Sequence, residues 1–327
     1  MDLITHLNMP KTKTLDLSII VPFLNEEENL GELYQNLGSV LPPLGLSYEI
    51  LLIDDGSTDK SFEITQNLAK KDSHVKVIRF TRNFGQTAAM QAGFKEASGR
   101  VYITLDADNQ NDPRDIGKLL EKMKEGYGVV SGWRKNRQDK FFSRKLPSKM
   151  ANWLISKATG VALKDYGCTL KAYDARFVDA FTLYGEMHRF IPAYCCYAGA
   201  KITEIPVNHL ARTKGVSKYG MSRIVKVLLD LFTVKFLGSF FTKPLYLFGG
   251  LGFSLNGLAV LAAGFVLYQK FYHDVYAHRN PVLLLAVFLS VLGMMLIMMG
   301  LIAELLMRTY HESQGKTVYL IQEKVNF

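Results

Sequence analysis

Two long apolar segments toward the end of the chain place the strongest constraint on its fold. They span Leu245–Phe271 and Val282–Met307, and each is longer than the roughly 20 residues that a helix needs to cross a bilayer. Two buried core helices are the alternative, but segments of this length with so few charges are unusual in a soluble core. We therefore expect two membrane-spanning helices within residues 244–310.

Basic residues concentrate on the outer flanks of these two segments. The chain has a net charge of +9, and seven of its Lys and Arg residues lie between Arg212 and Lys243. The loop 272–280, which joins the segments, holds Arg279 as its single Lys or Arg. The positive-inside rule then places both termini in the cytosol. Attraction of about 1 kcal/mol per Lys or Arg to anionic lipid also explains the charge, so no nucleic-acid partner is expected.

Short apolar strands alternate with helical patterns through the first 132 residues. The expected strands are Leu17–Pro22, Tyr48–Ile53, Val75–Phe80, Val101–Leu105 and Gly126–Gly132. The first is too short for a signal peptide, which also favours a cytosolic location. This spacing predicts an α/β fold with a mainly parallel, Rossmann-like sheet and helices on both faces. Neither a G-x-G-x-x-G loop after the first strand nor a Walker-type phosphate loop is present.

These patterns divide the chain into four expected parts. Residues 1–220 form a cytosolic α/β domain, and residues 221–243 form an amphipathic helix at the membrane interface. An ordinary core-facing helix is the alternative for the second part. Residues 244–310 hold the two membrane spans, and residues 311–327 follow as a cytosolic tail.

Carboxylates follow two of the expected strands directly. Asp54 and Asp55 end one strand, and Asp106 and Asp108 end another. The carboxyl ends of parallel strands are where open α/β sheets bind ligands. Hard cations such as Mg²⁺ or Mn²⁺ take oxygen ligands, so Asp106 and Asp108 are candidate metal ligands, and Gln110 can add a carbonyl oxygen. A solvated turn is the alternative for this stretch.

Two basic clusters come after the expected sheet. The first includes Arg134 and Arg144, and the second includes Arg212 and Lys218. A solvated loop, a phosphate site and a contact with lipid headgroups are all compatible with the first cluster. A metal site, a phosphate site and a membrane in succession indicate group transfer from a nucleotide sugar to a lipid phosphate.

Several motifs together resemble the family 2 glycosyltransferases, which have the GT-A fold. The four N-terminal motifs are Ser18-Ile-Ile-Val-Pro-Phe-Leu-Asn-Glu26, Ile53-Asp-Asp-Gly-Ser-Thr-Asp59, Arg82-Asn-Phe-Gly-Gln86 and Leu105-Asp-Ala-Asp-Asn-Gln110. Asp165-Tyr-Gly-Cys168 and Ser217-Lys-Tyr219 are similar to segments of the polyprenyl-phosphate members. That group includes dolichyl-phosphate mannose synthases and the bacterial undecaprenyl-phosphate aminoarabinose and glucose transferases.

The resemblance implies a role for each matching residue. It assigns nucleotide-sugar binding to Pro22, Asn25, Glu26, Asp54, Asp55, Asp106 and Gln110. It assigns the metal and diphosphate site to Asp106, Asp108 and Gln110, with Asp108 and Asp165 as the catalytic candidates. It assigns donor or acceptor phosphate binding to Arg134, Arg144, Arg212 and Lys218.

The implied reaction is an inverting, metal-dependent transfer of a sugar to polyprenyl phosphate. The resemblance favours a UDP-sugar over a GDP-sugar, undecaprenyl phosphate as acceptor, the bacterial plasma membrane as location, and a homotetramer. Thr169 stands where some relatives carry a proposed catalytic Asp, and Asn109 where many carry Leu. The first departure leaves open whether Asp165 acts as a base or positions the acceptor, because an ionised phosphate needs no base.

Two other functions are compatible with parts of the sequence. A processive polysaccharide synthase shares the fold, but such enzymes usually carry a Gln-x-x-Arg-Trp motif and more spans, which this sequence lacks. A non-catalytic membrane scaffold is the second, and the intact Asp106, Asp108 and Gln110 argue against it. The sequence does not identify the sugar.

Overall fold

The chain folds into two units. The computed structural model describes residues 13–135, 152, 155–157, 159–183, 187–210, 244–273, 276–312 and 319–327. The first unit comprises residues Met1–Val234 and Thr317–Phe327, and the second comprises Lys235–Lys316. The expected interface helix at 221–243 therefore lies outside the described residues.

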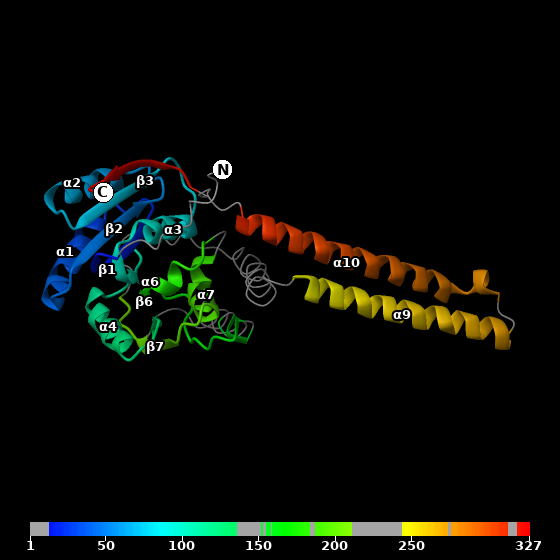
Figure 1. Cartoon of the computed structure of the whole chain (residues 1–327). Helices are drawn as coiled ribbons and strands as arrows, with labels where there is room; N and C mark the ends of the chain where they lie inside the picture. The colour runs from blue at the N-terminus through cyan, green and yellow to red at the C-terminus, as the bar shows by residue number, and fades with distance from the viewer. Residues whose placement is uncertain are drawn as a thin grey trace, which may run out of the picture. The chain divides into compact units, whose positions relative to one another are not determined.

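The first unit is built around an eight-stranded sheet in the order β7-β5-β6-β4-β1-β2-β3-β8 (Figure 1). Its strands are β1 (Leu15–Phe23), β2 (Tyr48–Asp54), β3 (Val75–Phe80), β4 (Gly99–Thr104), β5 (Val129–Trp133), β6 (Lys171–Asp174), β7 (Ile202–Pro206) and β8 (Ile321–Val325). Its helices are α1 (Leu30–Val40), η1 (Pro42–Leu44), α2 (Ser61–Lys71), α3 (Gln86–Glu96), η2 (Pro113–Asp115), α4 (Ile116–Lys124), α6 (Ala175–Val178), η4 (Met187–Phe190) and α7 (Ile191–Tyr197).

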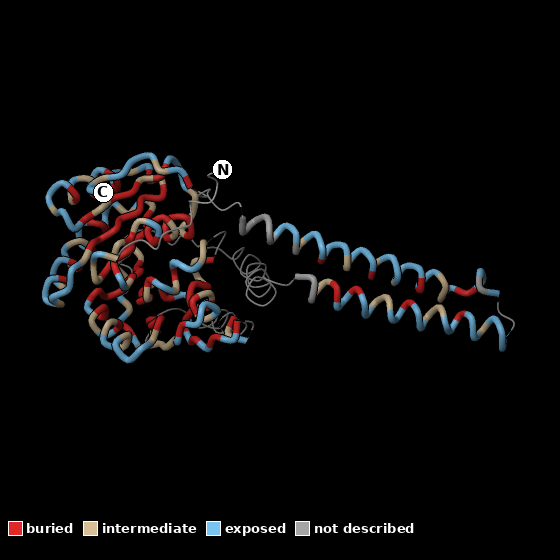
Figure 2. Tube along the Cα trace, viewed as in Figure 1, coloured by how far each residue is buried: buried red, intermediate tan, exposed pale blue. Residues whose placement is uncertain are grey.

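Alternation of apolar side chains along the central strands gives the sheet a core on each face. In β1, Ile19 and Val21 point into a core shared with α1, α2 and α4, whereas Ile20 points into a core shared with α3, α6 and α7. Figure 2 shows the central strands as the most buried part of this unit. The expected α/β sheet with helices on both faces is confirmed.

Strand direction places one edge of the sheet where ligands bind in such folds. Strands β3, β2, β1 and β4 run parallel, and β5 runs parallel to β4 because both pair antiparallel with β6. The loops that follow β1, β2, β3, β4 and β5 therefore leave from the same edge, which we call the carboxyl edge.

The end of the chain returns to this sheet. The sequence suggested a tail at residues 311–327, but β8 pairs antiparallel with β3 at the edge of the sheet. Tyr319, just before β8, is buried and stacks on Phe80 with ring centroids 5.1 Å apart. The backbone N–H of Thr81 donates to the carbonyl of Leu320 at 3.2 Å. These contacts stabilise the end of β3 at the carboxyl edge.

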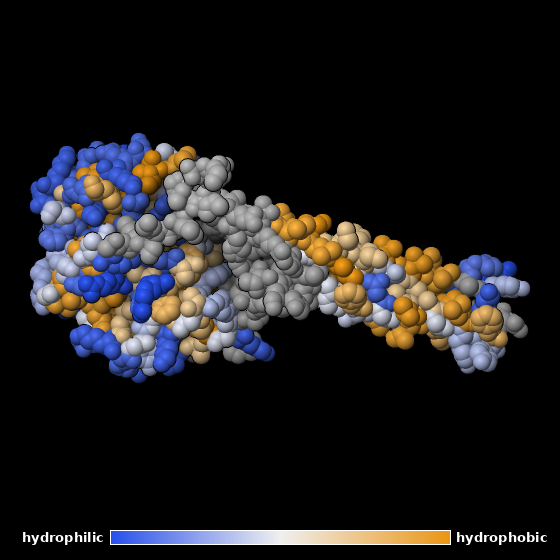
Figure 3. Space-filling model, viewed as in Figure 1, coloured by the Kyte–Doolittle hydropathy of each residue, from blue (hydrophilic) through white to orange (hydrophobic). Residues whose placement is uncertain are grey.

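The second unit is a pair of long apolar helices, α9 (Pro244–His273) and α10 (Pro281–Glu312), with η5 (Ala277–Arg279) between them. Residues Leu247–His273 and Pro281–Ala303 are long and apolar enough to cross a membrane. Figure 3 shows apolar residues along both helices, and most of them are exposed in the isolated chain. These features support the expected pair of membrane spans.

Small residues allow α9 and α10 to pack closely. A Cβ added at Gly252 would lie 2.6 Å from the carbonyl oxygen of Gly293, and one added at Gly293 would lie 2.3 Å from the Asn256 amide nitrogen. Ser290 Oγ donates to Asn256 Oδ1 across the same contact at 3.3 Å. Small residues and a polar pair of this kind are common where membrane helices associate.

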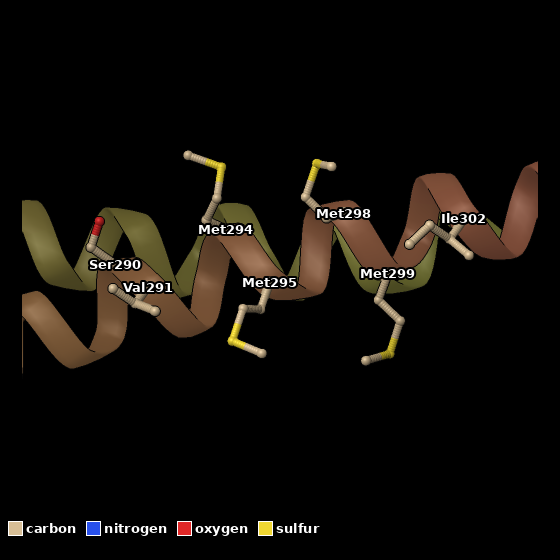
Figure 4. Close-up of a pocket in the computed structure, with 7 residues that line it drawn as sticks. All are labelled: Ser290, Val291, Met294, Met295, Met298, Met299 and Ile302. Atoms are coloured by element: carbon tan, nitrogen blue, oxygen red, sulfur yellow. The ribbon is translucent and has the colours of Figure 1, made fainter.

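Another face of α10 carries a shallow hollow that is lined by a cluster of methionines. Figure 4 shows Met294 and Met298 on one side of the helix and Met295 and Met299 on the other. These flexible apolar side chains are exposed, as expected of a surface that meets lipid tails.

Candidate active site

The loops after β1 and β2 interlock at the carboxyl edge. Asn25, in a left-handed backbone conformation with φ of 51°, accepts a hydrogen bond from the N–H of Thr58 at 2.8 Å. The Asn25 N–H donates to Ser57 Oγ, and the Glu26 N–H donates to Ser61 Oγ at 2.8 Å. Pro22 pairs with Ile53 in the adjacent strands below these loops. The structure therefore brings the predicted residues Pro22, Asn25 and Glu26 beside the β2 loop.

The predicted pair Asp54 and Asp55 ties three loops together. Asp54 is fully buried, accepts from the Ser57 N–H at 2.8 Å, and lies 3.6 Å from the Arg79 guanidinium. Asp55 accepts from the N–H groups of Phe84 and Gly85 at 2.7 Å and 2.9 Å. Burial raises the pKa of both carboxyls, against these hydrogen bonds. The pair fixes the shape of the carboxyl edge.

Gly56 lies so close to the backbone of Arg82 that a residue with a Cβ atom does not fit at this position. Its φ is +78°, and a Cβ there would lie 2.4 Å from the Arg82 carbonyl carbon. We expect Gly56→Ala to lower the free energy of unfolding by about 2–4 kcal/mol, from backbone strain plus overpacking. Gly45→Ala is the matched control, because Gly45 has a φ of +67° but open space around it. Thermal unfolding in detergent measures both, and an equal loss in the two variants would contradict the steric argument.

Two polar side chains lie near Asp106 at the end of β4. Gln86 Nε2, at the start of α3, donates to Asp106 Oδ1 at 2.9 Å, and the nearby Thr169 side chain favours the ionised form of the same carboxyl and so acts to lower its pKa. Gln86 directly follows Gly85, which Asp55 holds. The predicted nucleotide residues and the predicted metal residues are thus joined through two consecutive positions of the chain.

Asp106 and Asp108 form the acidic pair that the sequence predicted. Desolvation and the nearby Asp108 charge raise the pKa of Asp106 to about 6. The Gln110 N–H donates to Asp108 Oδ1 at 3.2 Å, so Gln110 lies beside the pair. Between them, Asn109 has a φ of 55° and donates to the Asn29 carbonyl at 3.1 Å. Asn tolerates this left-handed conformation better than Leu, which explains the departure at this position.

This acidic pair fits a divalent cation that is shared with a diphosphate. Two carboxylates that repel each other gain from a cation placed between them. Within the described ranges no group of three or more His, Cys, Asp or Glu side chains is placed to hold a metal. Mg²⁺ and Mn²⁺ are usually held by one or two carboxylates with the remaining ligands from substrate phosphates and water. Asp106 and Asp108 would supply the protein ligands of that arrangement.

Arg134 and Asp165 form a buried, bidentate ion pair. Arg134 Nε and Nη2 donate to the two Asp165 oxygens at 2.7 Å and 2.9 Å, and the side chains are 13% and 9% exposed. Burial opposes both charges, but the pairing outweighs it: the pKa of Asp165 is lowered and that of Arg134 is raised. An ionised carboxylate with a lowered pKa is a weak base. The geometry therefore favours the positioning role over the base role for Asp165.

Two residues to which the sequence analysis assigned no role in the site, Thr169 and Lys171, lie near these groups. Thr169 accepts from Asn111 Nδ2 at 2.9 Å, so its hydroxyl hydrogen is available for Asp106. Lys171 is buried at the start of β6, opposite Thr104 in β4 and Ser131 in β5. The available signal for Lys171 was a charged residue at the first position of β6, the strand that pairs with β4 just before Asp106.

The segment after β7, residues 208–210, is hydrogen-bonded to the stretch of chain that follows Asp106 and Asp108. The Asn208 N–H donates to Asp115 at 2.6 Å, His209 forms a β-bridge with Asn111, and the Leu210 N–H donates to the Gln110 carbonyl at 2.9 Å. The chain therefore enters the stretch that holds Arg212 and Lys218 from a point beside Gln110. Arg144, Arg212 and Lys218 themselves lie outside the described residues.

Comparisons with known proteins agree with this geometry. The model of the family described as Glycosyl transferase family 2 matches residues 18–184. The chain is 39% identical over 315 residues to a dodecaprenyl-phosphate galacturonate synthase of Rhizobium johnstonii (strain DSM 114642 / LMG 32736 / 3841), covering 95% of this chain and 93% of the relative.

Solved structures share the fold at lower sequence identity. Two structures of glucosyl-3-phosphoglycerate synthase from Mycobacterium tuberculosis are 18% identical and cover 67% of this chain. The first holds Mn²⁺, UDP and glucosyl-3-phosphoglycerate, with a TM-score of 0.51 and 80% of its chain covered. The second holds Mn²⁺, UDP and phosphoglyceric acid, with a TM-score of 0.52 and 78% covered. The sheet, the acidic carboxyl edge and these matches lead to one assignment: the chain belongs to glycosyl transferase family 2 and is a glycosyltransferase.

Proposed function

We propose that this protein transfers a sugar from a UDP-sugar to a polyprenyl phosphate at the cytosolic face of a membrane, with inversion at the anomeric carbon. The Rhizobium relative, a dodecaprenyl-phosphate galacturonate synthase, supports the acceptor class and makes galacturonate the first sugar to test. The two apolar helices, α9 and α10, suit an enzyme whose acceptor is a membrane lipid.

The main support for this proposal is that each carboxylate described in the site has a partner or a use other than that of a general base. An acceptor hydroxyl needs a base, and a phosphate monoester, ionised near neutral pH, does not. In the described part of the site, Asp165 is paired with Arg134, Asp106 and Asp108 suit a cation, and Thr169 replaces the acid of some relatives. Such a site favours an acceptor that is already a nucleophile.

The site residues then take the following roles. A Mg²⁺ or Mn²⁺ ion held by Asp106 and Asp108 would neutralise charge on the departing diphosphate. Gln86 orients Asp106, and Asp54 and Asp55 shape the loops that receive the nucleoside. Arg134 has five N–H donors and gives two of them to Asp165, which leaves donors for a phosphate oxygen of the acceptor. Holding donor and acceptor phosphates in line supplies much of the rate.

Transfer of label into lipid tests the proposal. Purified protein in detergent is given undecaprenyl phosphate and one radiolabelled donor at a time: UDP-galacturonate, UDP-glucose, UDP-N-acetylglucosamine or GDP-mannose. We expect label in the lipid phase from a UDP-sugar, abolished by EDTA and restored by Mn²⁺, and a product of inverted anomeric configuration by NMR. Nucleotide binding without transfer from any donor would instead favour a scaffold, and transfer that survives EDTA would refute the metal role.

A further inference from the structure

Lys171 is a buried lysine beside Asp165 and Arg134 that the proposed mechanism leaves without a role. The residue is 3% exposed, and it is the one lysine of the described ranges that is buried. Burying an ammonium group costs several kcal/mol unless partners compensate for it, and an apolar side chain of similar size is often at least as stable. Burial lowers the pKa of Lys171, so a lysine kept in such a place calls for an explanation.

The side-chain hydrogen bonds of Lys171 are made to the segment Asp165–Thr169. Lys171 Nζ donates to the carbonyl of Tyr166 at 3.2 Å and to the carbonyl of Cys168. These two carbonyls flank Gly167. Lys171 thus clamps the backbone of this segment on both sides of its glycine.

The same segment, Asp165–Thr169, also binds the side chain of Arg134. Both Asp165 oxygens accept from the Arg134 guanidinium, and a Cβ added at Gly167 would lie 3.1 Å from Arg134 Nη2. The Lys171 charge also favours the ionised form of Asp165. The orientation of Arg134 therefore depends on a backbone that Lys171 holds.

The carboxylates expected to bind the metal and the donor diphosphate depend less on this segment than Arg134 does. The Thr169 side chain does lie near Asp106, but Gln86 from α3 donates to Asp106 independently at 2.9 Å. Asp108 lies on the loop after β4, where Gln110 contacts it. Loosening the segment Asp165–Thr169 should therefore disturb Arg134 more than the metal and nucleotide groups.

We propose that Lys171 is a positioning residue, which clamps the segment Asp165–Thr169 so that Arg134 is held toward the acceptor phosphate. The proposal rests on the proposed function, because it concerns the acceptor half of that reaction. Lys171 acts through the backbone of its neighbours and does not itself touch the reacting atoms.

Steady-state kinetics with separate binding measurements test this role. We expect Lys171→Met to raise KM for polyprenyl phosphate at least 10-fold, while the Kd for Mn²⁺-UDP by calorimetry changes less than 3-fold. Lys171→Arg, which keeps a cation able to reach carbonyls, should restore most of the acceptor KM. Lys171→Gln serves the same comparison if the Met variant does not fold.

Tyr166→Phe is the matched control. Tyr166 is buried in the same segment, and its hydroxyl contacts Thr159 and Val161, away from Arg134. If loss of stability alone raised the acceptor KM, this variant would raise it as well, and the proposal would fail. Equal weakening of donor and acceptor, or an unchanged acceptor KM in Lys171→Met, would also overturn it. Wild-type protein in the same assay reports on the proposed function separately.

Discussion

Asp108→Asn should lower kcat by about 1,000-fold, the loss expected when several kcal/mol of charge stabilisation by a metal disappears. Asp108 is the better test of the acidic pair than Asp106, because Asp106 also accepts a hydrogen bond from the Gln86 side chain. The substitution removes one charge and keeps the shape of the side chain, so the loop after β4 should survive. In the wild type, Mn²⁺ should strengthen UDP binding, and in Asp108→Asn it should strengthen it far less.

Asp16→Asn is the control for this experiment. Asp16 lies near the start of β1, at the edge of the sheet opposite the site, where Ser47 donates to it and Arg100 lies 4.0 Å away. The variant removes the same charge from the protein and should leave turnover and the Mn²⁺ effect unchanged. A near-normal rate in Asp108→Asn would show that the acidic pair does not hold the catalytic metal.

The central strands could be predicted from the sequence because burial on both faces gives them continuous apolar runs. Val75–Phe80 has the expected bounds, and the strand before Asp106 ends one residue earlier than expected. β8 could not be predicted in the same way, because Ile321-Gln-Glu-Lys-Val325 is an edge strand whose middle residues are exposed. A polar segment of this kind is indistinguishable from a tail until its pairing with β3 is known.

Individual residues of the site could be predicted from the sequence, but the contacts between them could not. Acids at strand ends identified Asp54, Asp55, Asp106 and Asp108, because parallel strands bring their carboxyl ends to one edge. The ion pair between Arg134 and Asp165 joins positions 31 residues apart, and no local pattern reports such a contact. Lys171 was missed for a related reason: a lysine at the start of a short strand normally lies on the surface.

Breaking the Arg134–Asp165 pair should have the largest effect on stability. Removing one partner leaves the other as a buried, unpaired charge, which costs about 3–5 kcal/mol. We therefore expect Arg134→Met and Asp165→Asn each to lower the free energy of unfolding by about this amount. The double variant Arg134→Met/Asp165→Asn should lose less than the sum of the single variants, because it leaves neither charge of the pair buried without its partner. Glu121→Gln is the control, since Glu121 and Lys124 are both 72% exposed and such pairs contribute about 0–1 kcal/mol.

The same variants decide what Asp165 does in the reaction. The pKa of Asp165 lies below its ordinary value of 3.8, so the pair is intact at neutral pH and its contribution is lost only as the pH falls through that lowered value. A positioning Asp165 predicts that Asp165→Asn raises the acceptor KM and retains a measurable kcat. A general base predicts that kcat collapses while the acceptor KM stays unchanged. Acceptor titrations of folded Asp165→Asn protein separate the two outcomes, and a collapse confined to kcat would return the base role to Asp165.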